Sequence, residues 1–200
     1  MEFKKFVNPH RASNTYIVYK SKTAVIIDVG NIDSNIILNY LKEKKLTLKA
    51  VFLTHEHADH CCGVDNLASF LDFDLYCALE CEQNAQNPKL NYSKYLEDIE
   101  DFSLQKKAIP VGQNSIVKID DIHLKCYQTK GHSPGSMVYQ VGSLVFTGDT
   151  YMQYKTPLKL PNSSKKEHQQ SLQKLQAILT LKTFVCPGHG NVFKSSYFSN

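Results

Sequence analysis

Short apolar segments separated by polar turns run along most of this chain and predict a protein rich in β-strands. The predicted strands are residues 15–20, 23–28, 50–54, two strands within 111–128, 143–147 and 183–186. Each is short, apolar and rich in β-branched or aromatic residues, which is typical of buried strands. The polar pair Ser21-Lys22 separates the first two segments, which predicts a β-hairpin, and Asp120-Asp121 marks a second turn.

Three other segments have the apolar spacing of amphipathic helices. Residues 35–44 follow Asp33 and Ser34, either of which could cap a helix, and residues 61–71 repeat apolar positions at helical spacing. A third helix is predicted after Ser163-Ser164. Its inward residues are Leu172, Leu175, Ile178 and Leu179, and His168 is expected on its solvated outer face. Strand and helix segments thus alternate, and we expect an α/β protein.

Histidine and aspartate residues gather in a six-residue run, 55–60, directly after the strand predicted at 50–54. Side chains two apart on an extended chain point the same way, so His55 and His57 could hold one metal ion. A turn into a helix at Asp59 would direct Asp59 and His60 toward a second metal position. Four such residues at this spacing are improbable by chance and predict a metal site.

His132, Asp149 and His189 each follow a predicted strand, in loops that contain glycine or proline. Glycine lets the backbone approach a site closely. Because four strand ends carry the same residue types, we expect these side chains to converge on one site.

These motifs resemble those of the metallo-beta-lactamase superfamily over nearly the whole chain, with Asp28 in residues 26–30 as the first of five in family order. The resemblance implies a four-layer αββα sandwich with a metal site at one edge. It implies that His55, His57 and His132 bind a first metal ion, that Asp59, His60 and His189 bind a second, and that Asp149 bridges both. Asp28 would fix the histidine loop through hydrogen bonds.

Mixed imidazole and carboxylate donors suit zinc best, although iron or manganese is also compatible. Two divalent ions could share a hydroxide at neutral pH, with Asp59 and Asp149 as the catalytic carboxylates. The expected reaction is hydrolysis, because such a hydroxide attacks carbonyl or phosphoryl centres.

Composition supports a single domain over residues 1–200, since no linker-like segment divides the chain, and the resemblance implies that this domain has the metallo-beta-lactamase fold. The formal charge of +4 is dispersed, which argues against nucleic acid as a partner. No apolar run is long enough to span a membrane, and the first residues lack a signal peptide pattern. We therefore expect a cytoplasmic protein whose six cysteines are free thiols. The oligomeric state stays open.

Within the superfamily, the loops around His132 and Asp149 look most like those of the small glyoxalase II-like hydrolases. That resemblance implies thioester hydrolysis of a small molecule, with S-lactoylglutathione as the type substrate. Glyoxalase II carries a C-terminal helical domain that holds glutathione, and we expect that domain to be missing here. A partial substitute could come from the segment after Asp149. Its candidate substrate residues are Tyr151, Tyr154, Lys155 and Lys159.

Several alternatives remain open at this point. A persulfide dioxygenase has the same fold but uses a single iron, and the full set of second-site residues argues against it. A lactonase would use the same hydroxide on a cyclic ester. A superfamily nuclease would need an extra domain or a basic groove. A non-catalytic member would be expected to have lost some of the metal-binding residues.

Overall fold

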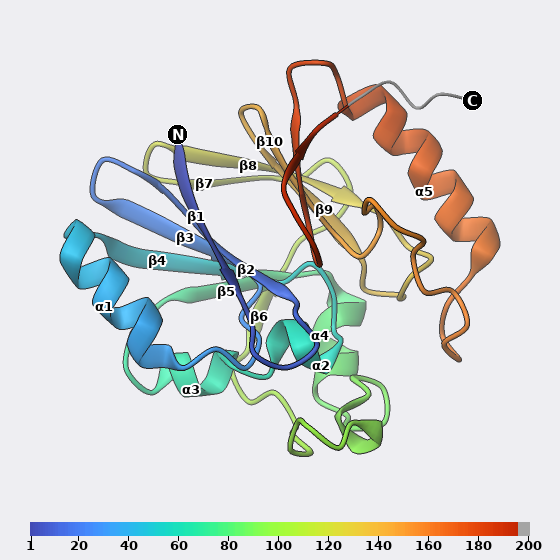
Figure 1. The fold of residues 1–200 in the computed structure, drawn as a ribbon, viewed down its shortest axis with the longest axis horizontal. Helices are drawn as coiled ribbons and strands as arrows, with labels where there is room; N and C mark the ends of the chain where they lie inside the picture. The colour runs from blue at the N-terminus through green and yellow to red at the C-terminus, as the bar shows by residue number, and fades with distance from the viewer. Residues whose placement is uncertain (196–200) are drawn as a thin grey trace.

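The computed structural model describes residues 1–195 and contains two six-stranded β-sheets that pack face to face (Figure 1). The first sheet has the order β1-β2-β3-β4-β5-β6 and consists of β1 (Glu2–Val7), β2 (Asn14–Lys20), β3 (Thr23–Ile27), β4 (Thr47–Phe52), β5 (Asp74–Cys77) and β6 (Ala108–Pro110). Strands β1 to β3 are antiparallel neighbours, whereas β3 to β6 are parallel. Parallel neighbours need long crossover connections, and these connections carry most of the helices.

The second sheet is almost entirely antiparallel. It has the order β12-β11-β10-β9-β8-β7 and consists of β7 (Ile116–Ile119), β8 (Ile122–Gln128), β9 (Met137–Val141), β10 (Leu144–Gly148), β11 (Phe184–Pro187) and β12 (Phe193–Lys194). Within this sheet, as the structure describes it, only β10 and β11 form a parallel pair. The crossover between these two strands contains the longest helix of the described chain.

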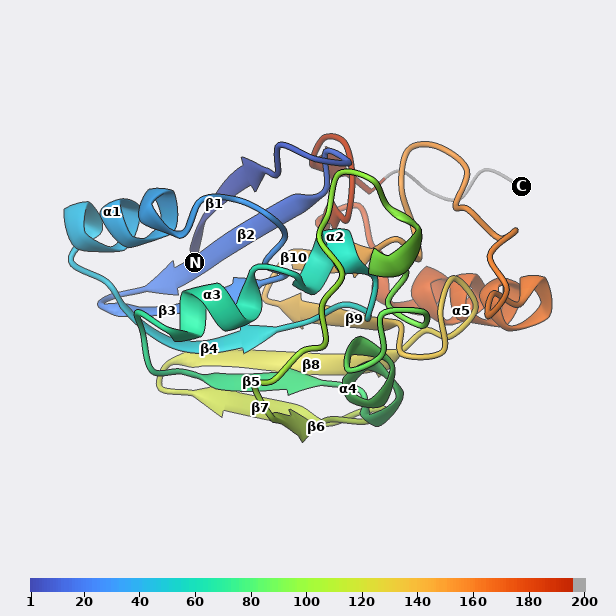
Figure 2. The same ribbon diagram turned by 90° about the horizontal axis from the view of Figure 1, so that it is seen from below.

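Helices cover the outer faces of both sheets. They are α1 (Ser34–Lys44), α2 (Ala58–Cys61), α3 (Val64–Ala68), α4 (Leu79–Ala85), the 3-10 helix η1 (Ser93–Tyr95) and α5 (Lys165–Ile178). Figure 2 shows α1 and α3 beside the first sheet and α5 at the far side of the second. Leu175 and Leu179 of the α5 region pack on Val138, Val145 and Val185 of the second sheet. The order helix, sheet, sheet, helix confirms the predicted αββα sandwich.

Aromatic residues join the two sheets across the central core. Phe52 of β4 meets Tyr139 of β9 edge to face, with 5.3 Å between ring centroids, and Tyr16 of β2 meets Phe146 of β10 at 5.2 Å. The buried Tyr139 hydroxyl donates to the carbonyl oxygen of Leu53 at 2.8 Å. The hydrogen bond satisfies the buried Tyr139 hydroxyl. Together with the ring contacts, it fixes the position of one sheet relative to the other.

Most of the predicted elements are confirmed. The hairpin turns at Ser21, which adopts a positive φ of 56°, and the second turn contains Asp120 with φ of 49°. Asp33 caps α1 by accepting a hydrogen bond from the backbone N–H of Asn35. Ser164 caps α5 in the same way, accepting from Glu167.

The predicted helix over residues 61–71 is wrong in its limits. The chain instead forms the short helices α2 and α3, which are separated at Cys62 and Gly63. The backbone of Val29 intervenes there, donating to the carbonyl of His60 and accepting from the N–H of Gly63. A Cβ atom at Gly63 would overlap the carbonyl oxygen of Gly30, so the close approach requires glycine.

All six cysteines are free thiols, as predicted. Within residues 1–195, no helix combines the length and apolar character needed to cross a membrane.

Candidate metal centre

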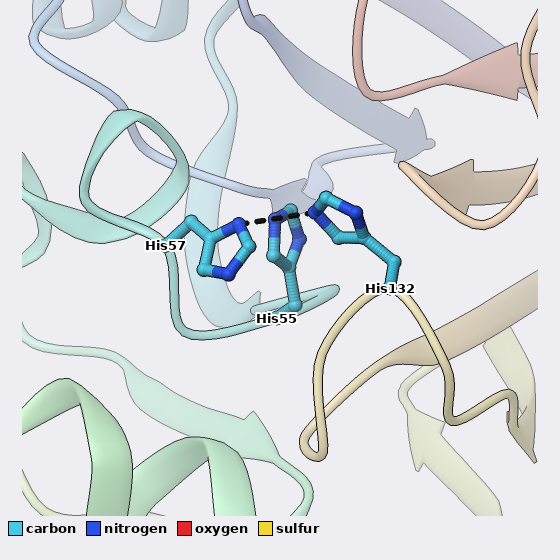
Figure 3. A group of neighbouring side chains, drawn as sticks. All are labelled: His55, His57 and His132. Atoms are coloured by element: carbon cyan, nitrogen blue, oxygen red, sulfur yellow. Dashed lines mark hydrogen bonds between the residues drawn. The ribbon is translucent and has the colours of Figure 1, made fainter. Parts of the chain in front are cut away.

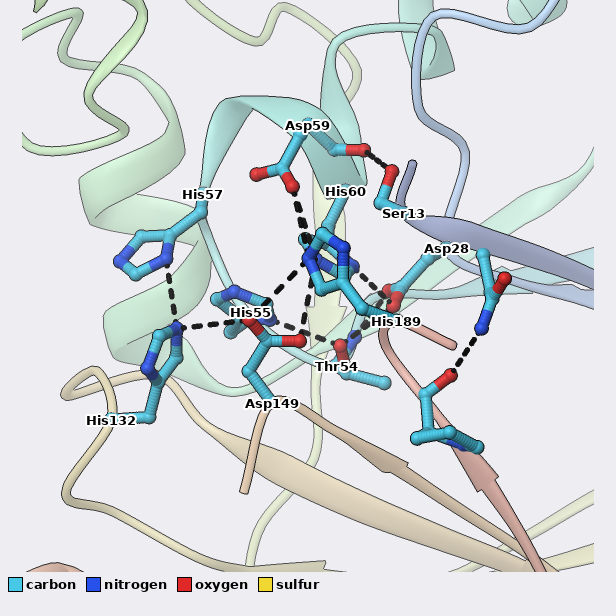
Figure 4. A network of polar contacts seen from close by, with 12 residues as sticks. Ser13, Asp28, Thr54, His55, His57, Asp59, His60, His132, Asp149 and His189 are labelled. Atoms are coloured by element: carbon cyan, nitrogen blue, oxygen red, sulfur yellow. Dashed lines mark hydrogen bonds and ion pairs between the residues drawn. The ribbon is translucent and has the colours of Figure 1, made fainter. Parts of the chain in front are cut away.

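The residues predicted to bind metal come together at one end of the two sheets (Figure 4). His55 and His57 follow β4, and Asp59 and His60 lie in α2. The other three follow strands or connect strands of the second sheet: His132 lies between β8 and β9, Asp149 follows β10, and His189 follows β11. The structure therefore brings together side chains from both halves of the chain.

His55, His57 and His132 form a first group of donors, shown in Figure 3. Their ligand nitrogens lie within 4.8 Å of one another. His57 Nδ1 and His132 Nε2 are 3.0 Å apart. Two neutral ring nitrogens this close need a shared proton or a cation between them, because lone pairs repel.

Asp59, His60 and His189 form a second group. His189 Nε2 lies 3.2 Å from both Asp59 Oδ2 and His60 Nε2. His60 Nε2 lies 3.5 Å from Asp59 Oδ2. Three potential ligand atoms thus converge on one point.

The Asp149 carboxylate lies between the two groups. Its Oδ2 atom is 3.6 Å from His132 Nε2 of the first group and 3.5 Å from His189 Nε2 of the second. Its Oδ1 atom is 3.6 Å from His60 Nε2. This placement is the one that a bridging ligand requires.

Two buried atoms of the site have no hydrogen-bond partner, and this is a second reason, besides the distances, to expect metal ions there. His55 Nε2 and Asp149 Oδ1 are buried, and no residue of the described chain forms a hydrogen bond with either. Buried polar atoms are rarely left unpaired, since this costs free energy. Tetrahedral zinc holds nitrogen or oxygen ligands about 3.3 Å apart. The separations of 3.0 to 3.6 Å between neighbouring donors match that spacing.

Asp28 supports the histidine run through three hydrogen bonds. Its Oδ1 atom accepts from the Thr54 backbone N–H, and its Oδ2 atom accepts from the Thr54 hydroxyl, both at 2.7 Å. His60 Nδ1 donates to the same Oδ2 atom at 2.9 Å, which leaves His60 Nε2 facing Asp59 and His189. Because the Thr54 hydroxyl donates to Asp28, it accepts from His55 Nδ1 at 3.1 Å. Asp28 itself adopts a positive φ of 56°, a strained conformation for a non-glycine residue.

The loop that carries His132 is fixed by Glu56, a residue that the sequence reasoning missed. Glu56 is buried on the other side of the histidine run, where it accepts hydrogen bonds from Asn84 and from Ser133, both at 2.9 Å. Burial raises the pKa of Glu56, and these two hydrogen bonds oppose the rise. The position of Glu56 between the predicted ligands His55 and His57 is the one sequence feature that could have indicated its role. His132 Nδ1 donates to the carbonyl of Pro157 at 3.0 Å, which directs His132 Nε2 toward the donors.

His168 corrects another expectation, because it is buried rather than solvated. Its Nε2 atom donates to the carbonyl of Thr150 at 2.9 Å, next to Asp149. Its backbone lies so close to Gly131 that a Cβ atom there would overlap it. Gly131 has a φ of 135°, which only glycine adopts readily. His168 therefore braces the loops of His132 and Asp149 from α5.

The electrostatics of the site favour cation binding. Burial, followed by the neighbouring histidines, lowers the pKa of His55 and of His57, so both rings are held in the neutral form that binds metal. Burial alone would lower the pKa of His60, but the nearby aspartates raise it to about 10 when no cation is present. Burial opposes ionisation of Asp59, yet His60 and His189 lower its pKa overall, and its carboxylate stays ionised.

A cleft of about 290 Å³, here called the metal cleft, opens over the donors. Its lining includes donors from both groups and, around them, Arg11, Tyr92, Leu96, Pro157 and Leu160. The four candidate substrate residues lie outside this lining. Lys155 and Lys159 line an adjacent cleft of about 650 Å³, which shares Pro157 with the metal cleft. Tyr154 lies beside Gly190, and Tyr151 packs against Phe193.

Comparison with known proteins agrees with this geometry. The sequence pattern of the metallo-beta-lactamase superfamily matches residues 8–189. A relative from Bacillus subtilis (strain 168), the probable metallo-hydrolase YqgX, is 33% identical over 149 residues, or 74% of this chain and 69% of the relative. The hydroxyacylglutathione hydrolase of Wigglesworthia glossinidia brevipalpis is 26% identical over 185 residues, which are 92% of this chain but 64% of that protein. The crystal structure of the BLEG-1 B3 metallo-beta-lactamase is similar with a TM-score of 0.88 and 28% identity, covering 96% of this chain and 94% of that one. The chain belongs to the metallo-beta-lactamase superfamily.

Proposed function

We propose that this protein is a dinuclear metal-dependent hydrolase that acts on a small thioester or ester. The observation that carries the proposal is the pair of donor groups with Asp149 between them, opening into a cleft of about 290 Å³. The first ion would be held by His55, His57 and His132, and the second by Asp59, His60 and His189. Asp149 would contact both ions. Zinc suits this donor set best, and iron or manganese is compatible with it.

Two ions bound in these groups would activate a water molecule near neutral pH and stabilise negative charge on the substrate oxygen. The chain's own residues complete the site. The carboxylates of Asp59 and Asp149, which line the cleft, would orient the water and receive its proton. The hydrogen bonds from His55, His60 and His132 to their supports hold each ring nitrogen in place before the substrate binds.

Thioester substrates are supported by the likeness to hydroxyacylglutathione hydrolases, of which this chain spans about two thirds or less. Lys155 and Lys159 line a neighbouring cleft that meets the metal cleft at Pro157. We propose that these lysines bind an anionic or polar part of the leaving group. Of the two tyrosines, Tyr154 lies beside Gly190, which follows His189, so its hydroxyl, and not that of Tyr151 against Phe193, would assist the substrate oxygen. Unchanged kinetics after replacing each of the four residues with alanine would remove this part of the proposal.

Metal content of the purified protein, measured by elemental analysis, and hydrolysis of S-lactoylglutathione test the proposal together. About two zinc or mixed ions per chain with thioester turnover would support it. About one iron per chain, with oxygen uptake on a persulfide and no hydrolysis, would replace it with a persulfide dioxygenase. Turnover of cyclic esters alone would point to a lactonase.

A further inference from the structure

A second cleft, of about 440 Å³, opens beside the metal cleft and has a different chemical character. Leu90, Tyr92, Tyr95, Leu160 and Pro161 line most of it, and Lys89 and Asn162 complete its lining. This apolar cleft shares Tyr92 and Leu160 with the metal cleft. An extended molecule could therefore occupy both at once.

Tyr92 forms the wall between the two clefts. Its ring packs against the ring of His57, with 4.9 Å between centroids, so one side of it belongs to the metal site. Tyr95 lies next to it, at 6.3 Å between ring centroids. Tyr92 adopts a φ of 65°, a conformation that costs free energy in a residue with a side chain. Such strain persists only where the surroundings impose it.

Asn91 imposes that conformation. Its buried side chain donates to the carbonyls of Ala85 and Phe102, both at 2.9 Å, and accepts from the N–H of Ser93 at 2.8 Å. Its own carbonyl accepts from the N–H of Ala58 at 2.8 Å. The wall is thus tied directly to helix α2, which carries Asp59 and His60. A rigid wall binds a ligand with little loss of conformational entropy.

We propose that the apolar cleft binds the acyl substituent of the substrate, an aliphatic or aromatic group of several carbons attached to the carbonyl in the metal cleft. This inference rests on the proposed hydrolase function and names its substrate class. The acyl group is assigned to this side because the cleft that meets the metal cleft at Pro157 contains Lys155, Lys159 and Lys165. A lysine-lined cleft suits a charged or polar leaving group, whereas Tyr92, Tyr95 and Leu160 suit hydrocarbon.

The test uses acetyl, butyryl and hexanoyl thioesters of N-acetylcysteamine, a thiol without charge, so the lysine-lined cleft contributes equally throughout. In the unaltered, metal-loaded protein, kcat/KM is expected to rise roughly fourfold per added methylene until the cleft is filled. The variant Tyr95→Ala removes a wall of the apolar cleft without touching the metal cleft. It is expected to lower the ratio of hexanoyl to acetyl kcat/KM by about tenfold.

Phe70→Ala is the matched control. Phe70 is also an exposed aromatic residue, 55% exposed against 63% for Tyr95, but it lines neither cleft. The hexanoyl to acetyl ratio should not change in this variant. Equal rates for all chain lengths, or the same length dependence in Tyr95→Ala as in the unaltered protein, would overturn the acyl assignment while leaving the hydrolase proposal intact.

Binding provides a readout that does not depend on turnover. Ketone analogues, in which a methylene replaces the thioester sulfur, can be titrated by calorimetry. The hexanoyl analogue should bind more tightly than the acetyl analogue, and Tyr95→Ala should reduce this difference by about tenfold. If this preference holds but no ester or thioester is hydrolysed, the cleft assignment stands and the proposed reaction fails. If the preference is absent, the cleft assignment fails.

Discussion

The two donor groups of the metal centre differ in how deeply the fold buries them. In the first group, His55 is 1% exposed, His132 is 2% and His57 is 8%. In the second, the side chains of Asp59 and His189 are 15% and 17% exposed, although His60 is fully buried. Donors of both groups line the metal cleft, but the first group is buried more deeply than the second.

The groups also differ in how firmly their rings are held. His55 and His132 of the first group each donate a hydrogen bond from the ring nitrogen that faces away from the donors, and in the second group His60 does the same. Within residues 1–195, no hydrogen bond fixes the remote ring nitrogen of His189 or of His57, although the His57 ring packs against Tyr92. Fixed rings bind metal more tightly because less freedom is lost on binding. We expect a tight first ion and a more readily exchanged second ion.

Asp149→Asn should weaken metal binding in both donor groups, because Asp149 lies close to donors of each. We expect a loss of activity of at least about a hundredfold, larger than for residues that only support ligands, and a loss of metal from both positions. Elemental analysis and thioester hydrolysis measure these effects. Asp74→Asn, on the exposed side of β5, is the control. Retention of both ions with normal activity would exclude a shared ligand.

His189→Ala and His55→Ala should separate the two positions. The first variant is expected to lower the metal content by about one ion while the protein keeps its fold, because His189 lies at the cleft. The second should also lower thermal stability, since it leaves a cavity and disturbs the buried Thr54 and Asp28 contacts. Equilibrium dialysis and thermal unfolding of both variants give the comparison. Identical metal content and stability in the two would contradict it.

Asp28→Asn should weaken metal binding about tenfold to a hundredfold, chiefly at the second position, because His60 loses its charged hydrogen-bond acceptor. Competition with a chelating dye measures the affinity. Asp33→Asn offers a matched control, since aspartate and asparagine cap a helix equally well. An unchanged affinity in Asp28→Asn would mean that Thr54 and the backbone hold the histidine run without the carboxylate.

Glu56→Gln is expected to have the smallest effect. It keeps the volume but replaces the carboxylate that accepts from Asn84 and Ser133, which should destabilise the protein by about 1 kcal/mol. That corresponds to a shift of roughly 2–4 °C in thermal midpoint, measurable by scanning calorimetry. Glu43→Gln, on the exposed face of α1, controls for the change of charge. If Glu56→Gln lost activity at a temperature where the protein stays folded, Glu56 would have a role in placing His132.

Local sequence patterns predicted much of this architecture because the signals are local. The hairpin around Ser21, the cap at Asp33 and the strands before His55 and Asp149 each depend on a few neighbouring residues. The break between α2 and α3 could not be predicted in this way, because it arises from Val29 and Gly30 on a distant part of the chain.

The candidate site shows the same division. Spacing alone pointed to the residues at 55–60, and the glycine-flanked loops pointed to His132, Asp149 and His189. Tertiary packing determines the rest. His168 sits on a helix with lysines and glutamines, yet Thr150 and Gly131 bury it. The wall at Tyr92 depends on Asn91 reaching Ala85, Phe102 and Ala58, contacts for which no sequence motif exists.

The donors are spread over both sheets, and His189 is 129 positions beyond His60. A ribosome adds about 5–20 residues per second, so His189 is made on the order of ten seconds after His60. During that interval the nascent protein already contains the four donors of the histidine run, but the second donor group is incomplete because His189 is missing. Binding of an ion in the second group would therefore depend on the pairing of β11 with β10, which brings His189 to the site.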